Sequence, residues 1–130
     1  MNANHKCIFA LLLGLAAGTV GTNALLAQTK VPPAYFISEA TVNDPDLYKK
    51  FLMEEAKAPN SQFGGRQLVR GGRVVAIEGE PAPPPRVAIV AFESVEAAKR
   101  WAESPQHVEA TKIYHQAAAG RTYIVEGFLP

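Results

Sequence analysis

Residues 34–59 carry two successive patterns of apolar side chains, the first typical of a strand and the second typical of a helix. Residues 34–42, AYFISEATV, follow two prolines and are rich in aromatic and β-branched side chains, which predicts a strand. Residues 43–59 repeat apolar side chains at helical spacing and end at a proline. Either Asn43 or Asp44 is a suitable N-cap for this helix, with Pro45 in its first turn. We therefore expect a strand followed by a helix.

The middle of the chain predicts more strands, separated by a stiff connection. Residues 66–79, RQLVRGGRVVAIEG, favour strand on both sides of the glycine pair at 71–72, which either turns the chain or bends one long strand. Residues 80–85, EPAPPP, cannot join a sheet ladder and predict an extended connection. Residues 86–93 are apolar at nearly every position, which is typical of a strand with both faces buried.

Two helices and a last strand complete the pattern. Ser94 predicts the N-cap of a helix over 95–103, and Ser104, before a proline, predicts the N-cap of another over 105–119. Residues 121–129 predict the final strand. The order β-α-β-β-α-β indicates an α+β, ferredoxin-like fold, with a four-stranded antiparallel sheet and the helices on one face.

The strand at 86–93 also indicates how the domain associates. Successive side chains point to opposite faces of a strand, and here both sets are apolar. The helices can cover only one face of the sheet, so the other face needs a different cover. The same sheet of another copy suits a domain of this size. We therefore expect a homodimer in which two sheets pair face to face as a dimeric α/β barrel.

The beginning of the chain differs from the rest. A short basic start precedes an almost wholly apolar run at 8–18, and small residues then lead to plausible cleavage points after Ala24 or Ala27. This pattern predicts a signal peptide over residues 1–27 and a secreted or periplasmic domain over 28–130. An uncleaved N-terminal anchor is the alternative. The apolar run is shorter than the about 20 residues that a membrane span needs, so we expect no stable membrane insertion after cleavage.

Charge and cysteine content limit the function classes. The chain carries 13 Lys and Arg against 12 Asp and Glu, and loss of Lys6 with the signal peptide leaves 12 of each. Such a balance lacks the basic field that binds nucleic acid, so no nucleic-acid partner is expected. The single cysteine, Cys7, precedes the domain, which excludes disulfides and thiolate metal sites within it. His107 and His115 lack neighbours at metal-ligand spacing, so no metal site is predicted.

The glycine pairs at 64–65 and 71–72 raise the question of a phosphate loop. Such a loop lies between a strand and the N-terminus of a helix. Here each pair is followed by strand-favouring residues, and neither is followed by a Lys-Ser or Lys-Thr pair. We interpret the pairs as a turn and a bend. The chain also lacks a nucleophile-elbow sequence.

One predicted helix carries the strongest candidates for chemistry. His107, Thr111 and Tyr114 lie at i, i+4 and i+7 and share one helix face, which either lines a small, partly polar cavity or is an exposed edge. His107 is the candidate catalytic residue, because imidazole titrates near neutrality and can act as a general base. Tyr114 is a candidate ligand-binding residue. Trp101 is another, although packing in the core is its favoured role.

Glu39 and Arg66 are the remaining candidates for ligand binding. Glu39 lies inside an otherwise apolar strand, where a buried carboxylate needs a partner. An arginine such as Arg66, just after a glycine pair, could provide it. We expect one or both residues to border a pocket.

Seven short segments follow one another along the domain: FGGR (63–66), LVRGG (68–72), IEG (77–79), VAIVAFES (87–94), AA..W (97–101), SP (104–105) and VEG (125–127). Together they resemble the DUF1330 family, small proteins of the dimeric α/β-barrel, ferredoxin-like superfamily. The resemblance covers about residues 34 to 128. It implies the same fold and the same dimer that the strand pattern predicts.

The resemblance implies little about activity, since the family is defined by its domain. The wider superfamily includes cofactor-free monooxygenases, muconolactone-isomerase-like enzymes, chlorite-dismutase-like haem proteins and ligand binders. Two hypotheses follow for this chain. In the first, it binds a small molecule in a pocket between sheet and helices. In the second, it is a cofactor-independent enzyme for a small aromatic or lactone-like substrate, with His107 as base. Haem is disfavoured because neither histidine of the domain lies in a recognisable haem motif, and no cofactor is expected.

The chain departs from the family pattern after its SP pair. Family members commonly carry a Tyr two positions on and an Arg seven positions beyond it, where this chain has His107 and Tyr114. If that Arg holds an anionic ligand in the relatives, this protein need not bind the same ligand.

Overall fold

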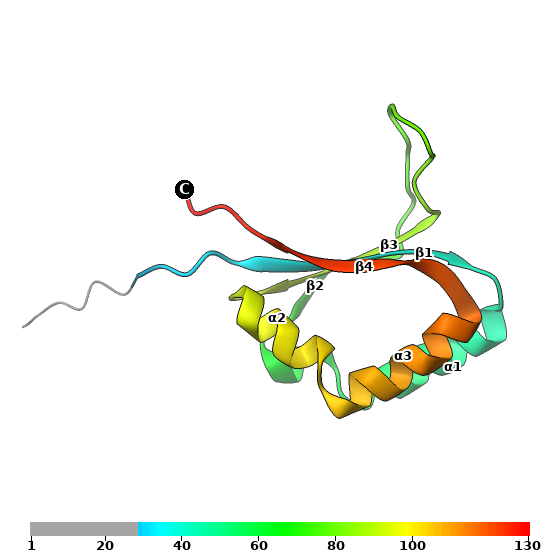
Figure 1. Ribbon diagram of the computed structural model, residues 1–130, viewed down its shortest axis with the longest axis horizontal. Coiled ribbons are helices and arrows are strands. Elements are labelled where there is room, and N and C mark those ends of the chain that lie inside the picture. The colour runs from blue at the N-terminus through cyan, green and yellow to red at the C-terminus, as the bar shows by residue number, and fades with distance from the viewer. Residues whose placement is uncertain (1–28) are drawn as a thin grey trace, which may run out of the picture.

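The computed structural model describes residues 29–130, which form one sheet with helices on one of its faces (Figure 1). The predicted signal peptide, residues 1–27, lies outside the described residues. Among residues 29–130, no helix has the length and apolar character that crossing a membrane requires.

Four antiparallel strands form the sheet in the order β2-β3-β1-β4. The elements in chain order are β1 (Ala34–Val42), α1 (Pro45–Glu55), the 3-10 helix η1 (Asn60–Phe63), β2 (Arg66–Arg70), β3 (Arg86–Phe92), α2 (Val95–Ala102), α3 (Pro105–Ala117) and β4 (Ala118–Glu126). The α-helices all lie on the same side of the sheet (Figure 1). This arrangement confirms the predicted α+β, ferredoxin-like fold.

A side-chain hydrogen-bond acceptor defines the start of α1. Asp44 Oδ1 accepts from the backbone N–H groups of Asp46 and Leu47 at 3.1 and 3.0 Å. Asp44, rather than Asn43, is therefore the N-cap, and Pro45 occupies the first turn as predicted.

The corner between α2 and α3 depends on two serines, one of which differs from its predicted role. Ser94 caps α2 as expected, because its Oγ accepts from the Ala97 N–H at 3.1 Å. Ser104 does not cap α3 with its side chain. Its hydroxyl donates instead to the Trp101 carbonyl at 2.7 Å, which binds one of the free carbonyls at the end of α2. The two serines thus hold α2 at both ends and position Trp101.

Residues 73–79 are not a strand, so that part of the sequence prediction was wrong. Gly71, with φ of 67°, turns the chain out of the sheet while its N–H donates to the Val87 carbonyl at 2.8 Å. If β2 continued, it would have to pair with the residues just before β3, at 80–85. Four of these are prolines, which have no backbone N–H to donate to a neighbouring strand. Residues 71–85 instead form an arm that projects on the side of the sheet away from the helices (Figure 1).

Two clusters of buried apolar side chains fill the space between the sheet and the helices. The first contains Phe36 and Trp101, whose rings meet edge to face with centroids 4.8 Å apart. The second lies between α1, α3 and the sheet and contains Phe51 and Tyr114, with ring centroids 5.4 Å apart. Aromatic residues from the sheet and all three α-helices therefore dominate the core.

The other face of the sheet carries apolar side chains that no helix within residues 29–130 covers. Ile37 is paired with Ile89 on β3 and with Tyr123 on β4, and Tyr35 is paired with Val125. Residues paired across neighbouring strands point to the same face, so these five side chains form a contiguous apolar surface. We call this surface the open face.

The cap at Asp44 gives a stability prediction. Asp44→Ala removes the acceptor for two backbone N–H groups and should lower the free energy of unfolding by about 1 kcal/mol. Urea titration followed by circular dichroism measures the change. Asn43→Ala is the matched control, because no side-chain hydrogen bond of Asn43 is found among residues 29–130. Equal losses in the two variants would contradict the assignment of the cap.

Candidate functional site

A cavity of about 130 Å³ lies between the sheet and the helices, where the two core clusters meet. Its apolar lining consists of Phe36, Phe51, Leu52, Ala56, Pro59, Ala88, Val90 and Trp101. Its polar and charged lining consists of Ser38, Tyr48, Glu55, Asn60, Gln67, Arg70, Arg86, His107, Thr111, Tyr114 and Thr122. A hollow that combines apolar walls with polar groups is usual in small-molecule sites.

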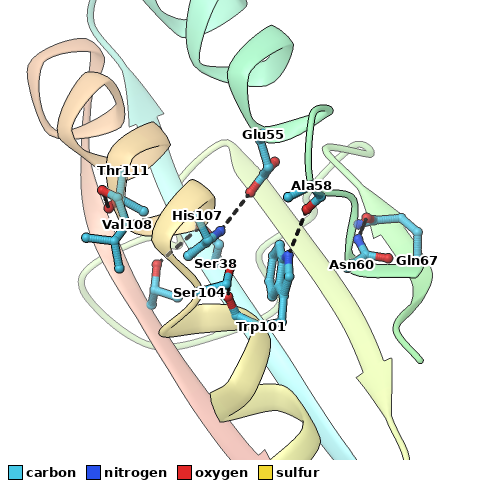
Figure 2. A network of polar contacts seen from close by, with 11 residues as sticks. Ser38, Glu55, Ala58, Asn60, Gln67, Trp101, Ser104, His107, Val108 and Thr111 are labelled. Carbon is cyan, nitrogen blue, oxygen red and sulfur yellow. Dashed lines mark hydrogen bonds and ion pairs between the residues drawn. The ribbon is translucent and has the colours of Figure 1, made fainter. Parts of the chain in front are cut away.

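His107 projects from the first turn of α3 into one end of the cavity. Its ring packs against Trp101 and Phe36, with centroids 4.2 and 5.8 Å away, and the residue is only 7% exposed. Its Nδ1 lies 3.5 Å from Glu55 Oε1 on α1 (Figure 2). That separation is too long for a good hydrogen bond, and Nδ1 has no hydrogen-bond partner among residues 29–130. The carboxylate and the imidazole are therefore close enough to interact, while Nδ1 is buried without a hydrogen-bond partner in the described part of the chain.

Tyr114 lies two turns further along α3 and is also 7% exposed. Burial raises the pKa of its hydroxyl, nearby Ser38 lowers the pKa by a smaller amount, and Tyr48 adds a further small increase. In spite of this closeness to Ser38, the Tyr114 hydroxyl makes no hydrogen bond of ordinary geometry within the described part of the chain. Gly120 on β4 leaves room for it, because a Cβ at that position would lie 2.9 Å from the hydroxyl oxygen. Tyr114 is thus a neutral phenol at pH 7 whose hydroxyl donor finds no acceptor among the described residues.

Arg86 brings a positive charge to the cavity from the first residue of β3. Its Nε donates to the Tyr48 hydroxyl at 2.9 Å, and its Cζ lies 4.9 Å from the centre of the Tyr48 ring. The guanidinium also rests on Gly71, where a Cβ would lie only 2.5 Å from Nη1. Tyr48 and Gly71 therefore hold this side chain in one place. Arg70, exposed at the end of β2, adds a second positive charge to the lining.

The amides in the lining are already engaged. Asn60 Nδ2 donates to Gln67 Oε1 at 3.3 Å (Figure 2). Gln67 Nε2 donates in turn to the Val69 carbonyl at 2.6 Å. These two side chains brace η1 against β2 beside the cavity.

The five candidate residues from the sequence lie in two separate places. His107, Tyr114 and Trp101 line the cavity. The indole N–H of Trp101 donates to the Ala58 carbonyl at 3.3 Å, so this residue contributes a wall rather than a free polar group (Figure 2).

Glu39 and Arg66 do not line this cavity. Glu39 lies on the opposite face of the sheet and forms an ion pair with Arg121 on β4. This pair raises the pKa of the Arg121 guanidinium. Arg66 is exposed and paired with Ala91, also on the opposite face. The partner of the strand carboxylate is therefore Arg121 and not Arg66.

Sequence reasoning missed Arg86, Tyr48 and Glu55 as site residues. Arg86 directly follows a proline run and begins the most apolar strand, which gave a weak signal for a residue at the edge of a pocket. Tyr48 and Glu55 lie seven residues apart on α1 and therefore share a helix face. Only the packing of α1 against α3 reveals that this face meets Tyr114 and His107.

Metal binding finds no support in the described part of the chain. Among residues 29–130, no three or more His, Cys, Asp or Glu residues come together in a group that could hold a metal ion. The pairing of His107 with Glu55 alone gives too few ligands for a structural or catalytic site.

Comparison with known sequences identifies a domain family. The family model described as "Domain of unknown function (DUF1330)" matches residues 33–128. No curated protein matches the sequence.

Several solved structures share the fold. The RPA0582 protein of unknown function from Rhodopseudomonas palustris has a TM-score of 0.56 and 20% identity, over 80% of this chain and 88% of that chain. A dimeric ferredoxin-like protein of unknown function from Thermobifida fusca has a TM-score of 0.50 and 14% identity, over 77% and 93%. Hydroxynitrile lyase from Passiflora edulis has a TM-score of 0.51 and 13% identity, over 78% and 99%. At these identities the likeness is one of fold.

The unused hydroxyl of Tyr114 gives a prediction about stability. Tyr114→Phe should leave the free energy of unfolding at pH 7 unchanged or slightly higher, because it removes a buried polar atom without a partner. Above about pH 10 the unfolded tyrosine ionises first, and the raised pKa in the folded protein makes the native state lose stability. Urea titrations between pH 7 and pH 11 should show a shallower alkaline loss in the Phe variant.

Tyr123→Phe, on the open face, is the control for loss of a tyrosine hydroxyl elsewhere in the sheet. If Tyr114→Phe instead lowered the free energy of unfolding at pH 7 by about 1 kcal/mol or more, the hydroxyl would have a partner in the folded protein.

Proposed function

Because the chain belongs to the DUF1330 family, whose domain has no assigned function, we propose a function from the cavity itself: the protein binds a small organic molecule between its sheet and its helices. The supporting observation is that His107 and Tyr114 line the same cavity, and that each holds a buried polar atom, Nδ1 and the hydroxyl, without a hydrogen-bond partner among residues 29–130. Leaving such a group unpaired costs about 1–3 kcal/mol, and folded proteins leave few of them. A ligand that bonds to either atom offsets that cost.

The size of the cavity limits the ligand. A cavity of about 150 Å³ can hold one benzene molecule. The volume here is about 130 Å³, which suits a single ring with small substituents that extend toward the cavity mouth.

A second candidate function is cofactor-independent catalysis. The observation that favours it is the 3.5 Å separation of His107 Nδ1 from Glu55 Oε1 inside an aromatic enclosure. A carboxylate beside an imidazole can hold the ring in one orientation, as a histidine base requires. The substrate in this case is a small aromatic or lactone-like compound, from which His107 takes a proton.

We also propose that the protein is a homodimer and that residues 1–27 direct its export to a secreted or periplasmic location. The dimer is supported by the uncovered apolar side chains of the open face and by the similar fold of the dimeric protein from Thermobifida fusca. The arm at 71–85 extends on the same side of the sheet and exposes Ile77 by 89%, so it adds apolar surface for a partner copy. Export is supported by the pattern of the first 27 residues.

Ligand binding is tested by protein-observed NMR with a library of single-ring compounds. Compounds that bind should shift the signals of the His107 ring and the Trp101 indole. In His107→Phe these compounds should bind at least about tenfold more weakly, because a hydrogen bond contributes roughly that much. His115→Phe is the matched control, since His115 lies on the same helix, is exposed and does not line the cavity.

A library that shifts none of these signals would contradict the proposed binding function.

The same compounds separate the two candidate functions. Conversion of a bound compound by the native protein, lost in His107→Gln with binding retained, supports the enzyme. Binding without conversion supports the ligand-binding protein.

The dimer is tested with two valines of equal exposure. Val125 on the open face and Val108 on α3 are both 43% exposed. Val125→Asp should shift the protein from dimer to monomer in multi-angle light scattering at micromolar concentration, because a buried unpaired carboxylate disfavours the interface. Val108→Asp should remain dimeric. A native protein that is monomeric under these conditions overturns the proposal.

A further inference from the structure

We propose that the ligand is a small single-ring carboxylate, whose carboxylate is bound by Arg86 and the Tyr114 hydroxyl while its ring lies toward His107. This inference rests on the proposed binding function and specifies the chemical class of the ligand. It follows from the charge, the order and the contacts of the groups at the two ends of the cavity.

The cavity lining carries positive charge that has no ion-pair partner among the described residues. Ion pairs among residues 29–130 engage Lys57, His107, Lys112 and Arg121, and none involves Arg86 or Arg70. A guanidinium has five N–H donors, and the described residues use only the one on Nε of Arg86. A partly buried cation with free donors facing a cavity is suited to an anion.

Contacts with Tyr48 and Gly71 preorganise the Arg86 side chain. The Tyr48 ring and hydroxyl hold one side of the guanidinium, and Gly71 supports the group closely enough that a Cβ there would displace it. A planar guanidinium held in this way matches a planar carboxylate, which can accept two parallel N–H bonds. The Tyr48 hydroxyl accepts from Arg86, so its own proton remains available as a donor.

The polar groups of the cavity follow a definite order along α1 and α3. Tyr48 contacts Arg86 and also lies beside Tyr114, with ring centroids 6.3 Å apart. Glu55, the acidic residue of the lining, is seven residues beyond Tyr48, about 10 Å along the helix, and faces His107. One end therefore offers a cation and phenol donors, and the other offers a carboxylate and an imidazole.

The order of groups along the cavity specifies the ligand further. Its negative charge belongs at the Arg86 end, because the Glu55 end would repel it. Phe36, Phe51 and Val90 supply the apolar walls for a ring between the two ends. A hydroxyl on the ring opposite the carboxylate would reach the His107 and Glu55 end. Benzoate and 4-hydroxybenzoate are therefore suitable probes.

The experiment compares each acid with its neutral amide, benzamide or 4-hydroxybenzamide, by isothermal titration calorimetry on the folded protein. We expect the acids to bind at least about tenfold more tightly than the amides, the factor that one charge-assisted hydrogen bond contributes. Arg86→Gln should remove this preference, so that each acid binds no more tightly than its amide. Gly71→Ala should weaken acid binding by moving Arg86.

Gly72→Ala is the matched control for the Gly71 variant. A Cβ on Gly72 meets no atom within 4 Å, so this substitution should leave the preference for acids intact. Because Gly71 has a positive φ, its variant can lose stability, and Arg86→Gln then decides the outcome by itself.

The outcomes separate this inference from the function on which it rests. Equal binding of acids and amides, unchanged in Arg86→Gln, overturns the carboxylate and leaves small-molecule binding standing. Binding of the amides alone has the same meaning. If neither acids nor amides bind, the carboxylate is overturned, and the NMR library then decides the binding function independently.

Discussion

The antiparallel packing of α1 on α3 is the contact on which the candidate site depends. The backbone N–H groups of Asn43 and Asp44 both donate to the carbonyl of Ala117, the last residue of α3, at 2.8 and 3.0 Å. These two hydrogen bonds set the register of the two helices. In that register Tyr48 lies beside Tyr114, and two turns away Glu55 lies beside His107. A shift of one turn would separate both pairs. The chemistry of the cavity is thus a consequence of where one helix begins and the other ends.

The same packing leaves the core less complete than stability alone would favour. His107 is enclosed by aromatic rings, yet its Nδ1 has no good hydrogen bond among the described residues. Tyr114 is buried, and its hydroxyl likewise has no hydrogen-bond partner among them. Phenylalanine at either position would fill similar space without a desolvated polar atom. Departures from the best packing are concentrated where proteins bind ligands or catalyse reactions, because function there outweighs a small loss of stability.

Local patterns predicted the fold well because each rule that they use acts over a few residues. The strand at 34–42, the cap at Asp44 or its neighbour, and the buried strand from Arg86 onward follow from side-chain periodicity and capping alone. The arm at 71–85 was not predicted in this way. Its departure from the sheet depends on the segment with which a longer β2 would have to pair, and a local pattern does not show that pairing. Helical spacing also placed His107 and Tyr114 on one face. Arg86 and Glu55 joined them only through contacts between segments distant in sequence, which no local pattern records.

The alternation of side chains in β1, β3 and β4 has a consequence for how this protein can change. Even-numbered residues such as Phe36, Ser38 and Val90 belong to the cavity side, and odd-numbered ones such as Ile37 and Ile89 belong to the open face. Alternate residues of the same strands are therefore under two different selective constraints, one from the cavity and one from the open face. Substitutions of cavity-side residues can alter ligand preference without altering self-association. Substitutions of open-face residues can alter self-association without altering ligand preference. A single-residue insertion within a strand, in contrast, would exchange the two sets at once.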